Sequence, residues 1–102
     1  MDAKAEIAIE IEDGPNGGRY VARVAGKPDS EMTYRKTGPG VWTIVHTGVP
    51  EALAGLGVGK ALVAWMVEDI RRRGLRIVPQ CPFTAAMLKR HPEWQDILQT
   101  PF

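Results

Sequence analysis

The sequence predicts an α/β fold in which a mixed, mainly antiparallel sheet packs against helices. Three observations predict it. Residues 7–46 alternate apolar and polar side chains between short turns, residues 58–73 carry a helical period, and a short apolar strand pattern follows at 75–79. Because a helix that joins two strands of one sheet makes them parallel, we expect the strand at 75–79 to lie beside that at 41–46, with a right-handed crossover.

The first half of the chain is expected to form four antiparallel strands. Alternation of isoleucine with alanine and glutamate predicts the first of them. The predicted strands are 7–12, 18–25, 31–36 and 41–46, and the last is β-branched and aromatic. Segments rich in Gly, Pro, Asn and Asp separate them, and such short turns imply an antiparallel meander.

Residues 58–73 are expected to form the crossover helix. Its apolar stripe consists of Val58, Leu62, Trp65, Met66 and Ile70. Three arginines suit the negative end of the helix dipole, and Gly74 follows the last turn, as is typical of a helix C-terminus. After the strand at 75–79, Pro82 precedes a last helix over 83–91 that Pro92 ends, and residues 93–102 are expected to form a helical turn and a tail.

Composition limits the classes of protein. The chain has 102 residues, of which 44% are hydrophobic and 25% charged, which fits one folded domain over 1–102. A net charge of +1 argues against a dedicated binder of nucleic acid or of an anionic membrane. The N-terminus carries acids among its apolar residues, unlike a signal peptide, and the longest apolar run, 61–67, is too short to span a membrane. We therefore expect a cytoplasmic protein.

Cysteine usage excludes further classes of site. The chain has one cysteine, Cys81, so no disulfide can form within it. No set of His, Cys, Asp and Glu has the spacing of metal ligands, and no metal is expected.

A glycine-rich segment, Gly55-Leu56-Gly57-Val58-Gly59-Lys60, lies between the fourth strand and the crossover helix. Free N–H groups and the helix dipole make such a place suitable for an anion, and glycines let a phosphate approach. A Walker A loop would need Gly at position 54 and Ser or Thr at 61, where alanines stand. A dinucleotide fingerprint would need Gly at position 60, where Lys60 stands, and an acid about 20 residues later, where none is well placed. Neither of these two motifs is therefore complete in this chain. A glycine-rich helix start without a ligand is the structural alternative.

Four ordered segments resemble the GNAT superfamily of acetyltransferases. They are His46-Thr47-Gly48-Val49-Pro50, Gly55-Leu56-Gly57-Val58-Gly59-Lys60-Ala61-Leu62-Val63, Val78-Pro79-Gln80-Cys81-Pro82-Phe83 and Arg90-His91-Pro92-Glu93-Trp94. Within the superfamily, the chain is similar to a small single-domain group that keeps a cysteine in a C-P-F segment. The resemblance spans nearly the whole chain and is specific over 46–94. It implies an acyl-CoA N-acyltransferase-like fold and transfer of an acetyl group from acetyl-coenzyme A to an amine.

The resemblance also implies which residues bind the coenzyme. The superfamily pattern is Gln/Arg-x-x-Gly-x-Gly/Ala, in which backbone amides hold the pyrophosphate; Gly57 and Gly59 match its two small positions, whereas Ala54 departs from the first. Val49 would offer its backbone to the pantetheine arm and an N–H to the thioester carbonyl. The implied coenzyme-binding residues are Val49, Ala54, Gly55, Leu56, Gly57, Val58, Gly59 and Lys60.

Cys81 and His46 are the candidate catalytic residues. Both lie at or just past the C-terminal ends of the strands expected to be parallel, the sheet edge where ligands bind. We expect them to face the acetyl group across the gap, with His46 as a base and Cys81 as a nucleophile or a contact of the thioester. The superfamily commonly uses a tyrosine acid, which the last helix lacks, and this absence favours a cysteine-centred variant. A small buried cysteine without a role is the alternative.

Two other classes of function are compatible with the sequence. The missing tyrosine and Ala54 are compatible with a non-catalytic module that binds coenzyme A or acetyl-coenzyme A and regulates. A plain protein-interaction domain would bind no coenzyme. The residues do not specify the acceptor amine.

Overall fold

The computed structural model describes residues 6–99, and its elements follow the expected order. They are β1 (Ala8–Asp13), β2 (Gly17–Arg23), β3 (Ser30–Gly38), β4 (Val41–Gly48), the short 3-10 helix η1 (Glu51–Leu53), α1 (Val58–Arg73), β5 (Arg76–Pro79), α2 (Pro82–Arg90) and the 3-10 helix η2 (Pro92–Ile97). The start of the segment compared with a signal peptide, 1–5, and the end of the expected tail, 100–102, lie outside the described residues.

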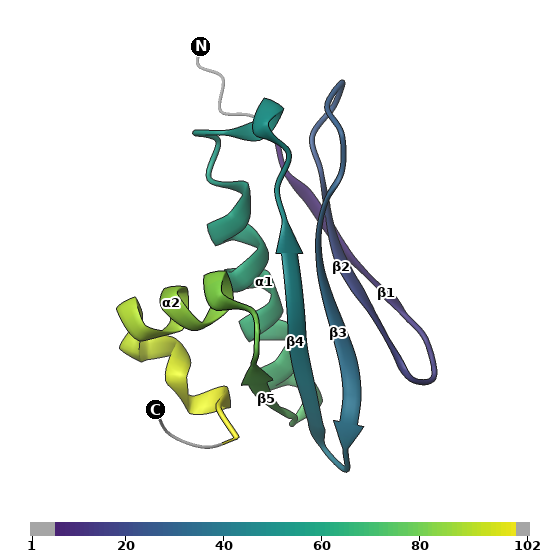
Figure 1. The fold of residues 1–102 in the computed structure, drawn as a ribbon, viewed down its shortest axis with the longest axis vertical. Coiled ribbons are helices and arrows are strands. Elements are labelled where there is room, and N and C mark those ends of the chain that lie inside the picture. Colours follow the sequence, from purple (N-terminus) through teal and green to yellow (C-terminus); the bar gives the residue numbers. More distant parts are fainter. Residues whose placement is uncertain (1–5, 100–102) are drawn as a thin grey trace.

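The five strands form one sheet in the order β1-β2-β3-β4-β5 (Figure 1). The first four pair antiparallel and β5 pairs parallel to β4, so α1 is the crossover between two parallel neighbours. The predicted α/β fold with a mixed, mainly antiparallel sheet is confirmed. The outer side of β5 is also occupied, because Leu98 forms a parallel bridge with Ile77 and the Gln99 N–H donates to the Ile77 carbonyl at 2.9 Å.

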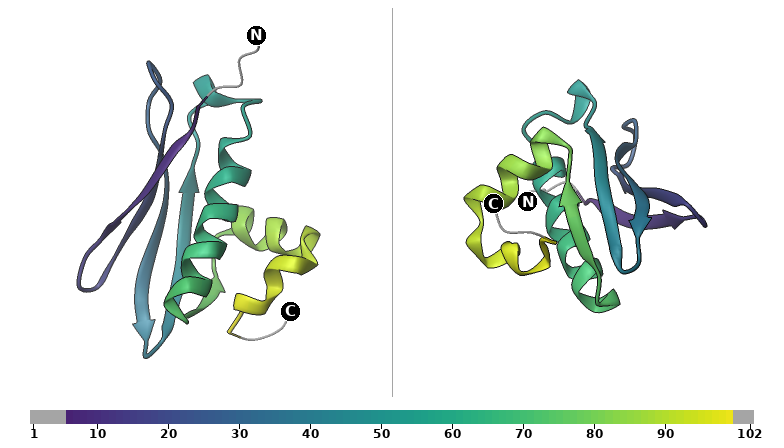
Figure 2. Two further views of the ribbon diagram at one scale, coloured as in Figure 1. Left: turned by 180° about the vertical axis from the view of Figure 1, so that it is seen from behind. Right: turned by 60° about the horizontal axis from the view of Figure 1, so that its bottom comes forward.

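Both α-helices lie on one side of the sheet, and within the described residues no helix covers the other face (Figure 2). The core fills the space between the two layers. On the bare face, Arg19 pairs with Glu12 and Glu31 at 2.7 and 2.8 Å. Such exposed ion pairs add little stability, but they keep the bare face polar.

The bounds of α1 agree with the prediction because both ends are encoded locally. Gly57 at its N-cap and Gly74 at its C-cap adopt left-handed conformations with φ of +74° and +70°, and the Gly74 N–H donates to the Arg71 carbonyl at 3.1 Å. The predicted stripe faces the sheet: Val58, Leu62, Met66 and Ile70 are 1% exposed or less, and Trp65 is half-buried.

A charged residue of α1 also lies on its core face, which the sequence prediction missed. Asp69 is 4% exposed and accepts hydrogen bonds from the Tyr20 hydroxyl at 2.9 Å and from Arg73 Nε at 2.8 Å. Tyr34 is satisfied in the same way by Asp13 at the edge of the core. Each of the two tyrosine hydroxyls thus has a carboxylate partner, which offsets the cost of burying a polar group.

We expect the protein to lose stability steeply in strong alkali. Burial raises the pKa of Tyr20, as does the nearby Asp69 carboxylate, and burial together with Asp13 raises the pKa of Tyr34. Tyrosines of the unfolded chain ionise at about pH 10, whereas the two folded tyrosines stay protonated at that pH. The free energy of unfolding is therefore unaffected by them below about pH 10 and falls above it by about 1.4 kcal/mol per pH unit for each tyrosine.

Tyr20→Phe tests this expectation, since the chain has two tyrosines. Urea unfolding between about pH 9 and 11 gives the free energy of unfolding as a function of pH. The part of its slope that comes from tyrosines should be about half as large in the variant, because one of the two titrating groups is gone. Lysines titrate equally in both proteins and cancel in the comparison. An identical slope in the two proteins would contradict the assignment.

Candidate functional site

The parallel pairing of β4 with β5 stops half-way along β4. The last pair is Ile44 with Pro79. The N–H groups of Gln80 and Cys81 then both donate to the Ile44 carbonyl, each at 2.9 Å, before the chain enters α2. β4 continues to Gly48, so the two segments separate from this point (Figure 1). Beyond it the two backbones are no longer paired, and the side chains of Cys81 and Thr47 meet between them.

A β-bulge in β4 coincides with the point of separation. Tyr34 of β3 pairs with Ile44 and Thr33 pairs with His46, so Val45 is the extra residue. A bulge of this kind changes which face of the sheet the following side chains occupy.

The glycine loop lies at the N-terminus of α1, as predicted. Gly55 and Gly57 have φ of +81° and +74°, and nothing lies within 4 Å of a Cβ built on either. A side chain there would be disfavoured by backbone conformation rather than by space. The first turn of α1 has no side-chain cap and no acidic residue. The N–H groups of Val58, Gly59 and Lys60, which precede the first helical bond from Ala61 to Gly57, are therefore available to an anion.

The side chains around the loop are unevenly exposed. Val58 is buried, so only its backbone belongs to the loop surface, whereas Ala54 and Lys60 are exposed. Leu56 and Val49 are apolar and 39% and 38% exposed, and they follow and precede η1 along the chain.

The C-P-F segment contacts the glycine loop. A Cβ on Gly59 would lie 2.7 Å from Cζ of Phe83, which is 38% exposed. Gly59 has no positive φ, so its glycine is explained by close approach of this ring rather than by conformation. The sequence prediction gave Gly59 only a phosphate-binding role.

A double-mutant cycle of Gly59→Ala and Phe83→Ala should show coupling. With Phe83 absent, alanine should stabilise α1 by up to about 1 kcal/mol through helix propensity. With Phe83 present, displacement of its ring should cancel that gain. Urea unfolding of the four proteins measures the coupling, and additive effects would contradict the contact.

Cys81 is the N-cap residue of α2 and is 3% exposed. Its thiol donates a hydrogen bond to Thr47 Oγ1 at 3.3 Å, and Thr47 Oγ1 lies 3.4 Å from Thr84 Oγ1. Burial acts to raise the pKa of the thiol. The Thr47 hydroxyl and the N–H and hydroxyl of Thr84 outweigh burial, so the pKa lies below its ordinary value.

The structure brings Cys81 to Thr47 and not to His46. Paired residues of neighbouring strands share a face, so His46 lies with Thr33 on the bare face, and Thr47 lies with the buried Met32 on the helix face. The side chains of His46 and Cys81 thus lie on opposite sides of the sheet, since Cys81 contacts Thr47 on the helix face. A catalytic role for His46 stays a prediction, and the sequence analysis missed Thr47 and Thr84 as partners of the thiol.

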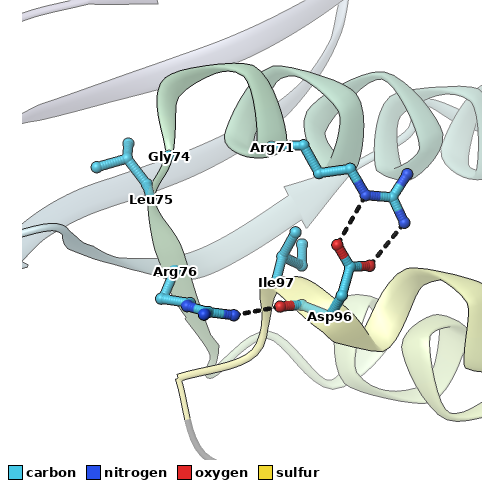
Figure 3. Close-up of a pocket in the computed structure, with 6 residues that line it drawn as sticks. All are labelled: Arg71, Gly74, Leu75, Arg76, Asp96 and Ile97. Carbon is cyan, nitrogen blue, oxygen red and sulfur yellow. Dashed lines mark hydrogen bonds and ion pairs between the residues drawn. The ribbon is translucent and has the colours of Figure 1, made fainter.

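Two surface hollows lie at the far end of α1 from the glycine loop. One is lined by Trp65, Glu68, Arg71 and Arg72, and the other by Arg71, Gly74, Leu75, Arg76, Asp96 and Ile97 (Figure 3). In the second, Arg71 forms a two-pronged ion pair with the Asp96 carboxylate at 2.9 and 2.6 Å, and Arg76 donates to the Asp96 carbonyl. Its polar groups are thus engaged in holding η2 against α1 and β5, and we do not place the candidate site there.

Within residues 6–99, no three His, Cys, Asp or Glu side chains gather into a group that could hold a metal ion. No helix in this range is long and apolar enough to cross a bilayer.

The candidate site thus combines two parallel strands that separate, a bulge beside the point of separation and a glycine loop at the start of α1. The model of the GCN5-related N-acetyl-transferase family matches residues 19–97, and the chain belongs to this family within the GNAT superfamily. It is also similar to the NMR solution structure of a GCN5-like protein from Staphylococcus aureus, with 33% identity over 91% of this chain and 90% of that one, and a TM-score of 0.68. Membership of this family makes the class of activity of the present chain that of an acyltransferase.

Proposed function

We propose that the protein transfers an acetyl group from acetyl-coenzyme A to an amine acceptor. The observation that carries this proposal is the placement of the uncapped N-terminus of α1, with its glycine loop, at the end of β4 that separates from β5. The loop amides suit the pyrophosphate in charge and in space, since no acid stands in the first turn. The half-exposed Leu56, Val49 and Phe83 suit the apolar part of the pantetheine arm.

In this proposal, Cys81 lies at the reacting end of the coenzyme. Its thiolate would attack the thioester carbonyl, coenzyme A would leave as its thiolate, and the acetyl group would then pass from sulfur to the amine. The Val49 N–H would stabilise the oxyanion of each tetrahedral intermediate. When the amine attacks the acetylated sulfur, its surplus proton goes to a base. Breakdown of this second tetrahedral intermediate then releases the acetylated amine and regenerates the Cys81 thiolate.

His46 is the proposed base, and its place in the sheet bears on which proton it accepts. Because His46 lies on the bare face and Cys81 does not, we assign it the proton of the amine rather than that of the thiol. The acceptor would then approach from the bare face while the coenzyme lies where β4 and β5 separate.

Incubation with labelled acetyl-coenzyme A and a panel of amines tests the proposal. The panel should hold small amines, a peptide N-terminus and a lysine peptide, and label should appear in at least one of them. Coenzyme binding without transfer to any amine would instead support the non-catalytic module, and absence of binding would support an interaction domain.

A further inference from the structure

A chain of three polar side chains joins the end of β4 to the start of α2. It runs from the Cys81 thiol to the Thr47 hydroxyl at 3.3 Å and from there to the Thr84 hydroxyl at 3.4 Å. Cys81 and Thr84 are 3% and 0% exposed, and Thr47 is half-buried. Nothing in the acetyl transfer proposed above uses either threonine.

We propose that Thr47, supported by Thr84, is a positioning residue that fixes the direction of the Cys81 sulfur and stabilises it as a thiolate for acetyl transfer. This inference rests on the proposed function. It assigns a use to Thr47, whereas the sequence singled out its neighbour His46.

The hydrogens on the three side chains are sufficient for this role. In the resting state the thiol donates to Thr47 Oγ1, which has its own hydrogen free to point toward Thr84. When the thiol loses its proton to solvent or a base, Thr47 must turn its single hydrogen to the sulfur. Thr84 can then donate to the vacated lone pair of Thr47, since either oxygen of that pair can be the donor. The chain therefore reverses direction without losing a hydrogen bond, and Thr84 gives the Thr47 oxygen a donor in the thiolate state that a lone hydroxyl would lack.

The Cys81 thiol has a hydroxyl and not a charged side chain as its hydrogen-bond partner. The titratable groups on the surrounding elements are His46 on β4, Lys60, Glu68, Asp69, Arg71, Arg72 and Arg73 on α1, Arg76 on β5, and Lys89 and Arg90 on α2. Those in the last turns of α1 bond to one another, to Tyr20 or to Asp96. His46 belongs to the bare face, and the thiol's hydrogen bond goes to Thr47. The hydroxyls and the first amides of α2 are consequently the groups that lower the pKa of Cys81 against the effect of burial.

The test uses the single cysteine of the chain, whose titration is free of other thiols. Thiolate absorbance and the rate of alkylation by iodoacetamide are followed against pH in the whole protein, with Cys81→Ser as the blank. Thr47→Val keeps the β-branched shape and removes the hydroxyl, so alkylation at neutral pH should be about tenfold slower, with a matching rise of the thiol pKa. Thr47→Ser should restore the wild-type profile, and Thr84→Val should give a smaller shift.

Thr43→Val is the matched control, since Thr43 lies on the same strand and bonds to Thr37 instead. It should leave the thiol titration unchanged. An unshifted titration in folded Thr47→Val, or a shift that Thr47→Ser does not reverse, would overturn the inference. Acetyl transfer by the wild type tests the proposed function, whereas the thiol titration tests the role of Thr47 and needs no acceptor. The two proposals can therefore fail separately. In an active enzyme, Thr47→Val should lower kcat and leave coenzyme affinity unchanged.

Discussion

Replacing Gly57 with glutamate is expected to abolish binding of acetyl-coenzyme A. The residue has φ of +74° and open space around a built Cβ, so the new side chain meets no protein atom within 4 Å. Its carboxylate would occupy the place that we assign to the pyrophosphate and would satisfy the dipole of α1. Calorimetric titration should show micromolar binding, about −8 kcal/mol, for the wild type and none for Gly57→Glu.

Gly40→Glu is the matched control for this experiment. Gly40 has φ of +71° and an equally open surrounding, but it precedes β4 whereas Gly57 follows that strand's far end. Both variants bear the same backbone strain, about 1 kcal/mol, and the same charge change. Loss of binding in both variants would point to a general effect on the fold, and retention in both would exclude the glycine loop as the coenzyme site.

Cys81→Ala is expected to abolish acetyl transfer while coenzyme affinity changes by no more than a few-fold. The expected loss of kcat is at least about a hundredfold, because the acetyl group would have no nucleophile to pass through. The buried side chain is small, and its loss should cost only about 1 kcal/mol of stability. The measurements are labelled acetyl transfer and calorimetric titration of the variant.

Mass spectrometry distinguishes the two roles open to Cys81. Wild type mixed with acetyl-coenzyme A in the absence of an amine should gain one acetyl group that hydroxylamine removes, and Cys81→Ala should not. As the chain has one cysteine, such a thioester can be assigned directly. Full turnover by Cys81→Ala would exclude the nucleophile and favour direct attack of the amine on the coenzyme thioester.

Features set by neighbouring residues were predicted well from the sequence. The bounds of α1 agree at both ends, since a left-handed glycine precedes it and another follows it. The meander agrees to within about two residues at each strand end, because turns rich in glycine and proline set the strand ends. The place of the glycine loop followed from the same local signals.

Features set by distant contacts were not predictable in this way. The hydroxyl that donates to Asp69 belongs to Tyr20, 49 residues earlier, and no period along α1 indicates this contact. The extra residue Val45 is defined only by pairing with β3, yet it decides that Thr47 and not His46 meets Cys81. The fit of Phe83 against Gly59 likewise depends on how α2 packs on α1.

The segment that bridges β5 bears on how far this sheet can grow. A bare edge strand is a template for other chains, but here Leu98 and Gln99 already pair with Ile77. The opposite edge, β1, carries Glu10 and Glu12, which form ion pairs with Arg19 and Arg23 of β2, so a strand of a second molecule would meet charged side chains there. One edge is therefore blocked by the chain itself and the other is discouraged by charge, which protects the protein from edge-to-edge aggregation.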